Sequence, residues 1–129
     1  MNDELKRKIE ESKYNIGYSK GDLRPGATEF TSIIIVDDII YKVVNGQVTF
    51  LKDQKEKIDK VWNYVNAMQG VIRSEAERVK ELSHIKDSHM DQITFTFDGE
   101  NFTLTSKVTD EKAVNFYNEI VKEILDIIK

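Results

Sequence analysis

The 129-residue chain contains no cysteine, one proline and only two histidines. Without cysteine there is no disulfide framework, no thiolate nucleophile and no zinc site with sulfur ligands. The histidines, His84 and His89, lie five residues apart, so a helix would not bring both rings to one face as an i, i+4 pair would. Residues 84–91 therefore indicate a polar connector, and we expect neither a metal nor a cofactor.

Sequence signatures of common enzyme sites are missing as well. The chain has no glycine-rich phosphate loop of either familiar spacing, no nucleophile elbow and no pair of carboxylates set apart from the surface. It also has no hydrophobic run long enough to cross a bilayer. We expect a cytoplasmic protein of a bacterium or of a phage-infected cell, with no membrane partner and no enzymatic activity.

The net charge of −4 is concentrated in the last third of the chain. Residues 1–52 carry eight acidic and eight basic side chains, residues 53–87 carry seven of each, and residues 88–129 carry eight acidic against four basic. Direct nucleic-acid binding is not expected, because phosphate contacts need clustered lysines and arginines. The acidic excess fits either a face that docks on a basic partner or an ordinary solvated helix face.

The N-terminal part combines a short helix with an irregular segment. Residues 2–13 have the pattern of an amphipathic surface helix, and residues 14–26 contain three of the six glycines and the only proline. Because loops carry binding residues more often than regular elements do, we interpret residues 14–26 as a contact loop, with a packed linker as the alternative. The candidate partner-binding residues of this loop are Tyr14, Tyr18, Lys20 and Arg24.

Residues 29–52 predict a three-stranded antiparallel meander. Its turns are Asp37-Asp38 and Asn45-Gly46, and the second is a strong signal for a two-residue hairpin turn. With that turn, Tyr41 faces Phe50 across the hairpin. Apolar residues occupy both faces of the meander, so the sheet needs cover on both sides, from a third layer or from an oligomer.

Residues 53–88 predict a long central helix. Asp53 and Glu56 have the spacing of a capping box, and apolar residues then recur every three or four positions. The register continues across Gly70, which favours one long helix over two shorter ones. The seven-residue repeat of this stripe suggests either an oligomer seam or an ordinary helix-on-sheet core. The seam residues would be Val61, Val65, Met68, Ile72, Val79 and Leu82.

Residues 92–108 predict a second hairpin, with Asp98-Gly99 as its turn and Phe95 opposite Phe102. The other face of this hairpin is a solvent-exposed surface or a binding platform made of threonines, namely Thr94, Thr96, Thr103 and Thr105. Residues 110–128 predict the last helix, capped by Thr109-Asp110 and apolar on one side. Its acidic side is the second candidate partner-binding surface, formed by Glu111, Glu119, Glu123 and Asp126.

Together the elements predict a single α+β domain. It would contain an antiparallel sheet of about five strands, one long central helix, a C-terminal helix and a short N-terminal helix. Residues 1–28 would form the N-terminal helix and loop, residues 29–88 the meander and long helix, and residues 89–129 the hairpin and last helix.

The lack of catalytic signatures, the small size and the acidic last third favour a protein that acts by occupying another macromolecule. The partner would be another protein, alone or in a nucleoprotein complex, and the class would be an inhibitor such as a phage antidefence or bacterial immunity protein. Two other hypotheses stay open. Residues 14–26 would bind or sequester a small ligand, or the long helix would assemble the chain into a homodimer or a larger structure.

Overall fold

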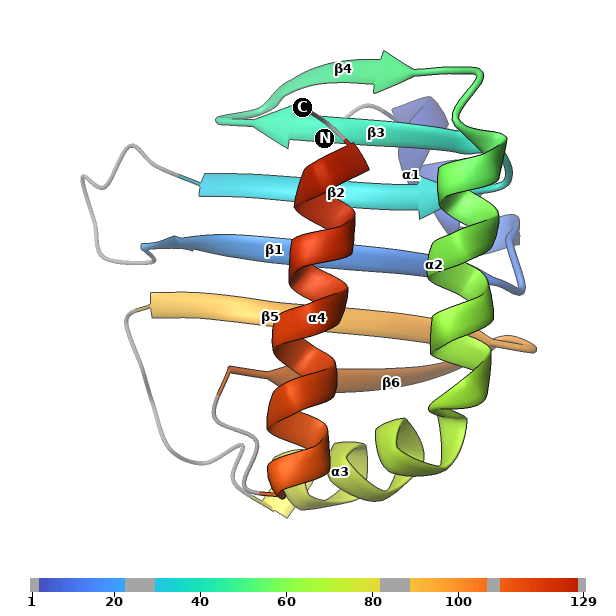
Figure 1. Ribbon diagram of the computed structural model, residues 1–129. Helices are drawn as coiled ribbons and strands as arrows, with labels where there is room; N and C mark the ends of the chain where they lie inside the picture. The colour runs from blue at the N-terminus through green and yellow to red at the C-terminus, as the bar shows by residue number, and fades with distance from the viewer. Residues whose placement is uncertain (1–2, 23–29, 82–88, 107–109, 128–129) are drawn as a thin grey trace.

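The computed structural model describes residues 3–22, 30–81, 89–106 and 110–127 (Figure 1). These residues form six strands and four helices, which confirms the α+β class expected from the sequence. Their order is α1 (Asp3–Glu11), β1 (Asn15–Asp22), β2 (Phe30–Val36), β3 (Ile39–Val44), β4 (Gln47–Leu51), α2 (Lys55–Ala67), α3 (Gln69–Glu81), β5 (His89–Phe97), β6 (Glu100–Thr105) and α4 (Glu111–Ile127).

The six strands form one antiparallel sheet in the order β4-β3-β2-β1-β5-β6. Both predicted hairpins are present in the predicted register, with Tyr41 opposite Phe50 and Phe95 opposite Phe102. The three-stranded meander of β2, β3 and β4 is confirmed too. β1 joins the meander to the second hairpin, because it pairs with β2 on one side and with β5 on the other.

β1 is the strand that the sequence pattern misses. The prediction of an irregular loop over residues 14–26 is wrong for residues 15–22, which form this central strand. One face of β1 carries the buried Ile16 and Tyr18, whereas the other carries small residues such as Gly17 and Ser19. This composition gives only a weak strand signal, and hydrogen bonding of the backbone to both neighbours stabilises β1 instead.

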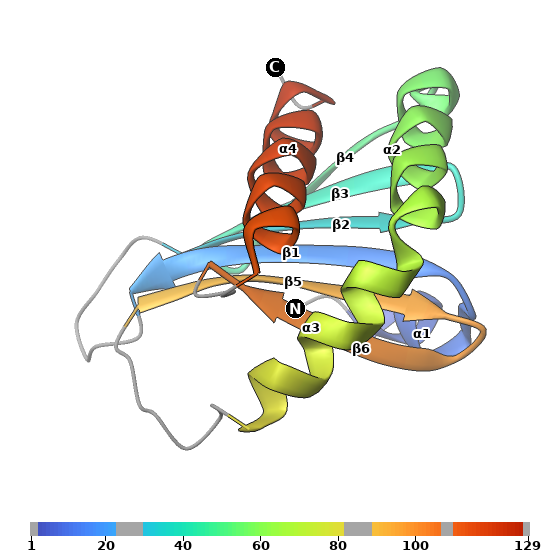
Figure 2. The same ribbon diagram turned by 60° about the horizontal axis from the view of Figure 1, so that its bottom comes forward.

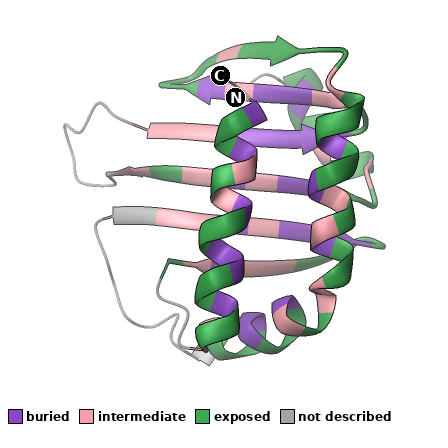
Figure 3. Ribbon diagram, viewed as in Figure 1, coloured by how far each residue is buried: buried purple, intermediate pink, exposed green. Residues whose placement is uncertain are grey.

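Helices α2, α3 and α4 cover one face of the sheet (Figures 1 and 2). Figure 3 shows the buried residues on the sides of these helices that face the strands. The side chains of Ile35, Phe95 and Phe116 are fully buried in this main core. Full burial of a side chain of this size stabilises the fold by about 1.5–3 kcal/mol relative to exposure.

Helix α1 lies on the opposite face, behind the sheet in Figure 1. The buried Leu5 packs with Ile34 and Val36 in a second, smaller core. The Lys8 ammonium also donates a hydrogen bond to the Tyr41 hydroxyl at 3.2 Å. Strands β2 and β3 of the meander are therefore covered on both faces, by three layers within one chain, whereas most of β4 is exposed.

The predicted single long helix is in fact two helices, α2 and α3. Met68 separates them, with φ −108° and ψ 15°, and its N–H donates to the Val65 carbonyl at 3.0 Å. This bond reaches only three residues back, as in a tightened last helical turn. The prediction of one helix is wrong. The spacing of apolar residues is the same before and after the bend, so this spacing does not reveal the bend. The bend directs α3 toward β6 (Figure 2).

Of the two predicted helix caps, the one at α2 is absent and the one at α4 is present. The capping box at the start of α2 is wrong, because the helix begins at Lys55 and Asp53 has a left-handed φ of 62°. At the last helix, the Asp110 carboxylate accepts a hydrogen bond from the Lys112 N–H at 2.8 Å, so the Asp110 cap is confirmed. Thr109 lies outside the described residues.

Glu75 is a carboxylate on the buried side of α3, where its residue is 2% exposed. One carboxylate oxygen, Oε1, accepts a hydrogen bond from Arg78 Nη1 at 2.8 Å. The other oxygen, Oε2, has no hydrogen-bond partner in the described part of the chain. A buried charge that is only partly paired costs free energy, and the arginine that pairs with it is half-exposed.

We expect replacement of Glu75 by methionine to stabilise the protein by about 1 kcal/mol, which corresponds to a rise of about 2–4 °C in the melting temperature. Methionine fills a similar volume and removes the unpaired oxygen, and Arg78 keeps access to water. Thermal unfolding measured by circular dichroism tests this, with Glu77→Met as the control because Glu77 forms an exposed ion pair on the same helix. A lower melting temperature for Glu75→Met alone would contradict the prediction.

Gly70 occupies the first turn of α3, where an added Cβ would meet no atom within 4 Å. Because alanine has the higher helix propensity, we expect Gly70→Ala to stabilise the protein by up to about 1 kcal/mol in urea unfolding. Gly46→Ala is the contrasting variant, since Gly46 has φ 87° and an L side chain is strained there. Destabilisation by both substitutions would show that Gly70 is needed for the bend.

Candidate functional site

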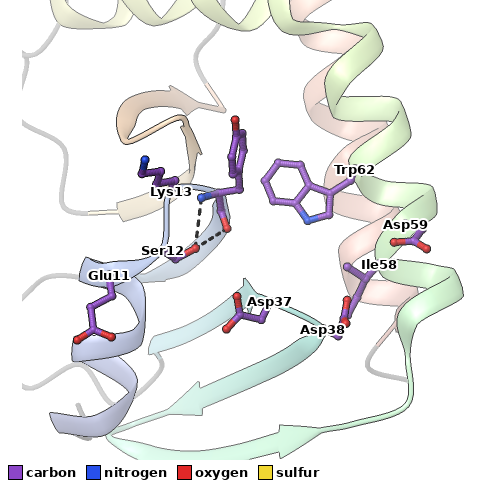
Figure 4. Close-up of a pocket in the computed structure, with 9 residues that line it drawn as sticks. Glu11, Ser12, Lys13, Asp37, Asp38, Ile58, Asp59 and Trp62 are labelled. Atoms are coloured by element: carbon purple, nitrogen blue, oxygen red, sulfur yellow. Dashed lines mark hydrogen bonds between the residues drawn. The ribbon is translucent and has the colours of Figure 1, made fainter.

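An open cleft of about 420 Å³ lies where the end of α1, the β2–β3 turn and α2 come together (Figure 4). Its lining combines two aromatic rings with four carboxylates. We call it the acidic–aromatic cleft. The rings are Tyr14 and Trp62, and the carboxylates are Glu11, Asp37, Asp38 and Asp59.

The aromatic wall of the cleft is held from both sides. The Ser12 hydroxyl donates to the Tyr14 carbonyl at 2.7 Å and accepts from the Tyr14 N–H at 3.2 Å, which fixes the bend between α1 and β1. Tyr14 meets Trp62 edge to face at 6.5 Å, and Trp62 in turn meets Phe97 at 6.3 Å. Trp62 therefore belongs to the wall of the cleft and also packs against the main core.

The acidic wall comes from three separate elements. Asp37 and Asp38 form the β2–β3 turn, where Asp37 adopts a left-handed φ of 55°. Glu11 is the last residue of α1, and Asp59 projects from α2 and forms an ion pair with Lys55 at 2.9 Å. Lys13 also lines the cleft and Lys55 pairs with Asp59, so two of the four negative charges are offset and the cleft keeps a smaller negative excess.

This combination suits a cationic group. A lysine or arginine side chain is attracted to the faces of aromatic rings near its path and to carboxylates at its head. Nucleotides and other anionic metabolites would meet four carboxylates and be repelled. The lining of the cleft is therefore better suited to a positively charged group than to an anion.

The predicted contact loop is not one surface. Tyr14 lines the cleft and is 55% exposed, but Tyr18 is 3% exposed and lies in the main core. Lys20 is exposed on β1, six residues along the strand from Tyr14, which corresponds to about 20 Å. Arg24 lies outside the described residues. The strand thus separates Tyr14 from Lys20, and the small-ligand hypothesis for residues 14–26 stays a prediction.

The acidic side of α4 is partly engaged within the helix layer. The Glu123 carboxylate lies 3.4 Å from the Lys60 ammonium on α2. Burial raises the pKa of the Tyr64 hydroxyl, and the nearby charges of Glu119 and Glu123 add to this. Glu111 and Asp126, the other two residues of this predicted surface, are exposed. Binding of a partner on this side of α4 stays a prediction.

The predicted oligomer seam lies largely inside the chain's own core. Val61, Val65 and Ile72 are 0% exposed, and Met68 and Val79 pack against the same core as partly buried residues. Leu82 lies outside the described residues. These positions fit the helix-on-sheet interpretation of the repeat. Self-association through this stripe stays a prediction. Val61, Val65 and Ile72 have no exposed surface to offer a second copy.

The threonine face of the second hairpin satisfies many of its own polar groups. The hydroxyls of Thr94 and Thr103 lie 3.0 Å apart across the ladder, and the Thr96 hydroxyl donates to the Asn101 side-chain carbonyl at 2.7 Å. Thr96 is also buried. A binding platform here would have to compete with these internal hydrogen bonds, so the acidic–aromatic cleft is the stronger candidate.

Sequence reasoning missed most of the residues that form the cleft. The sequence pattern places Glu11, Asp59 and Trp62 only in helices, and Asp37-Asp38 only in a turn. The one available signal was the pair of adjacent aspartates at a hairpin tip, beside the first turns of a helix that contains the single tryptophan. Within the described residues, no group of histidines and acids is arranged to hold a metal ion, and no helix is long and apolar enough to cross a membrane.

Comparison of the chain with protein-family models, with curated proteins and with solved structures gives no match.

Tyr18 takes part in a polar cluster inside the helix-covered face of the sheet. The Tyr117 hydroxyl on α4 donates a hydrogen bond to the Asp91 carboxylate at 2.5 Å. Burial, with the Asp91 charge as the second cause, raises the pKa of Tyr18 to about 12. Burial and the Asp91 hydrogen bond also raise the pKa of Tyr117. Both hydroxyls therefore stay protonated in the folded protein at pH values where free tyrosine ionises.

Unfolding should consequently become easier in alkaline solution. An unfolded tyrosine loses its proton near pH 10, whereas folded Tyr18 keeps its proton to about pH 12, so above pH 10 the unfolded state binds fewer protons and stability falls as pH rises. We expect the urea midpoint of Tyr18→Phe to decline less between pH 9 and pH 12 than that of the wild type. Tyr14→Phe is the control because Tyr14 is largely exposed, and an equal decline in both variants would contradict the prediction.

Proposed function

We propose that the protein acts by binding a second protein through the acidic–aromatic cleft, which takes up a lysine or arginine side chain of that partner. The observation that carries the proposal is the presence of two aromatic rings and four carboxylates in one open cleft. An inserted side chain would lay its apolar stem against Trp62 and Tyr14 and bring its charged head to the carboxylates.

The character of the lining residues supports a protein partner. Tryptophan, tyrosine and arginine dominate the binding energy of many protein interfaces, because each buries a large area with a polar group at its edge. Tyr14 is largely exposed, so it offers contact area to an incoming surface. The net charge of −4 would also speed the approach of a basic surface over the distance of a Debye length.

A protein that covers a basic surface of another protein inhibits it whenever that surface must bind a ligand or substrate. Basic surfaces commonly hold phosphate groups, including those of nucleic acids. The finer form of the proposal is therefore the inhibitor class expected from the sequence, including phage antidefence and bacterial immunity proteins. In this scheme the protein needs no catalytic group, since occupation of the partner surface is the activity.

The test is affinity capture from bacterial lysates by the tagged full-length protein and by the Asp37→Asn/Asp38→Asn variant. Asparagine tolerates the left-handed φ of Asp37, so the turn should persist while two charges are removed. We expect the variant to bind a captured partner at least about tenfold more weakly, because a charge-assisted contact contributes about 1.5–3 kcal/mol. Mass spectrometry identifies the partner, and titration with purified partner gives the affinity.

The matched control is Asp53→Asn/Asp98→Asn. Both aspartates are exposed, have left-handed φ values of 62° and 51°, and do not line the cleft, so the net charge changes equally without altering the site. Equal binding by the two double variants would contradict the proposal. The fluorescence emission of Trp62, the single tryptophan, supplies a second measure of binding at the cleft. A response to a free polyamine, with no protein captured by the cleft, would indicate a small cationic ligand and overturn the protein-partner proposal.

A further inference from the structure

The two edges of the sheet differ in how they are protected. At the β6 edge, α3 packs against the strand and the Arg73 guanidinium lies 4.6 Å from the centre of the Phe102 ring. Arg73 also lies 3.7 Å from the Glu100 carboxylate. Charged side chains and a covering helix are two devices that keep an edge strand from pairing with other chains.

The β4 edge lacks this protection. Its five residues, Gln47–Leu51, include no charge and no proline, and Figure 3 colours most of the strand as exposed. Phe50 is 56% exposed and Leu51 is 37% exposed, and both belong to this strand. The nearest charged side chain in the sequence, Lys52, follows the strand and lies over the Phe50 ring at 5.3 Å. The strand itself therefore presents an uncharged backbone edge with apolar side chains.

The outward-pointing backbone groups of β4 follow from the hairpin register. Asn45 and Gly46 have φ values of 51° and 87°, as in a type I′ turn, so the pair that flanks the turn is hydrogen-bonded. Hydrogen-bonded and non-hydrogen-bonded pairs alternate along an antiparallel ladder. The N–H and C=O groups of Val48 and Phe50 therefore point away from β3, toward the open edge.

A two-fold axis through Thr49 would satisfy these groups with a second copy of the same strand. Val48 of one copy would lie opposite Phe50 of the other, and these are the two residues whose backbone groups point outward. This register pairs all five residues of the strand, whereas a shift by two residues in either direction pairs only three of them. It also keeps the helix-covered faces of the two sheets on the same side, so apolar side chains meet on the side of α1.

We propose that β4 pairs with β4 of a second copy, in antiparallel register about Thr49, to form a continuous twelve-stranded sheet. A second copy fits better than a foreign peptide, because peptide-binding edges gain specificity from side-chain pockets beside the strand. The acidic–aromatic cleft is not lined by any residue of β4, and the side chains on both faces of β4 are largely exposed. The interface is small, so the dimer is weak and concentration-dependent.

The absence of cysteine from the chain makes a cross-linking test direct. In the proposed register the two Thr49 residues form a non-hydrogen-bonded pair with Cα atoms about 4.5 Å apart, within the range that a disulfide spans. We expect Thr49→Cys to form a disulfide dimer under mild oxidation about tenfold faster than Asn101→Cys, because a pre-formed pair raises the local thiol concentration. Asn101 is the matched control, since it is exposed on the protected edge strand β6.

Solution mass supplies the second arm of the test. Sedimentation equilibrium between about 10 μM and about 1 mM should show a monomer–dimer equilibrium for the wild type, as expected for a small interface. Phe50→Lys should stay monomeric over the same range with an unchanged circular dichroism spectrum, because Phe50 is mostly exposed in the single chain. A monomeric wild type, or equal oxidation rates at positions 49 and 101, would overturn the proposal. Neither outcome bears on the acidic–aromatic cleft, which lies on other elements.

Discussion

Contact between the apolar side of the sheet and helices α2 and α4 holds the molecule together. Isoleucine and phenylalanine side chains from β1, β2, β3 and β5 meet the inner sides of these helices in one continuous core. The two helices also bind each other directly, through the Lys60–Glu123 ion pair and the contact between Tyr64 and Phe116. Removal of α2 and α4 would expose most of one sheet face, and the hydrophobic effect is the dominant favourable contribution to folding.

The cleft exists because the two faces of the sheet are covered to different extents. α1 is short and packs mainly on β2 and β3, and its C-terminal end lies near the β2–β3 turn. α2 passes the same edge on the other side of the sheet (Figure 4). Where the two layers approach each other around the turn, their polar ends surround a space that neither layer fills. The charged residues of the cleft therefore come from a turn and from the terminal parts of helices, where polar residues are common.

Sequence reasoning succeeded where structure is local and failed where it is not. Asn45-Gly46 and Asp98-Gly99 predict their hairpins because few other residues adopt the left-handed conformations of these turns, and the wide apolar stripe of α4 marks a helix unambiguously. β1 was missed because its stability comes from strands distant in the sequence. The cleft was missed because residues 11–14, 37–38 and 58–62 converge only in the folded chain, and each group resembles solvated surface on its own.

The double role of Trp62, which both packs against the core and lines the cleft, has a consequence for binding. Its ring contacts Phe97 and Tyr14 edge to face, and the Ser12 hydroxyl holds the backbone of Tyr14 in place. Movement of the cleft wall would therefore disturb core packing, which is dense and resists deformation. A partner that enters the cleft meets a Trp62 ring already held against the core, so little conformational entropy of this side chain is lost when the complex forms. The main entropic cost falls on the incoming lysine or arginine.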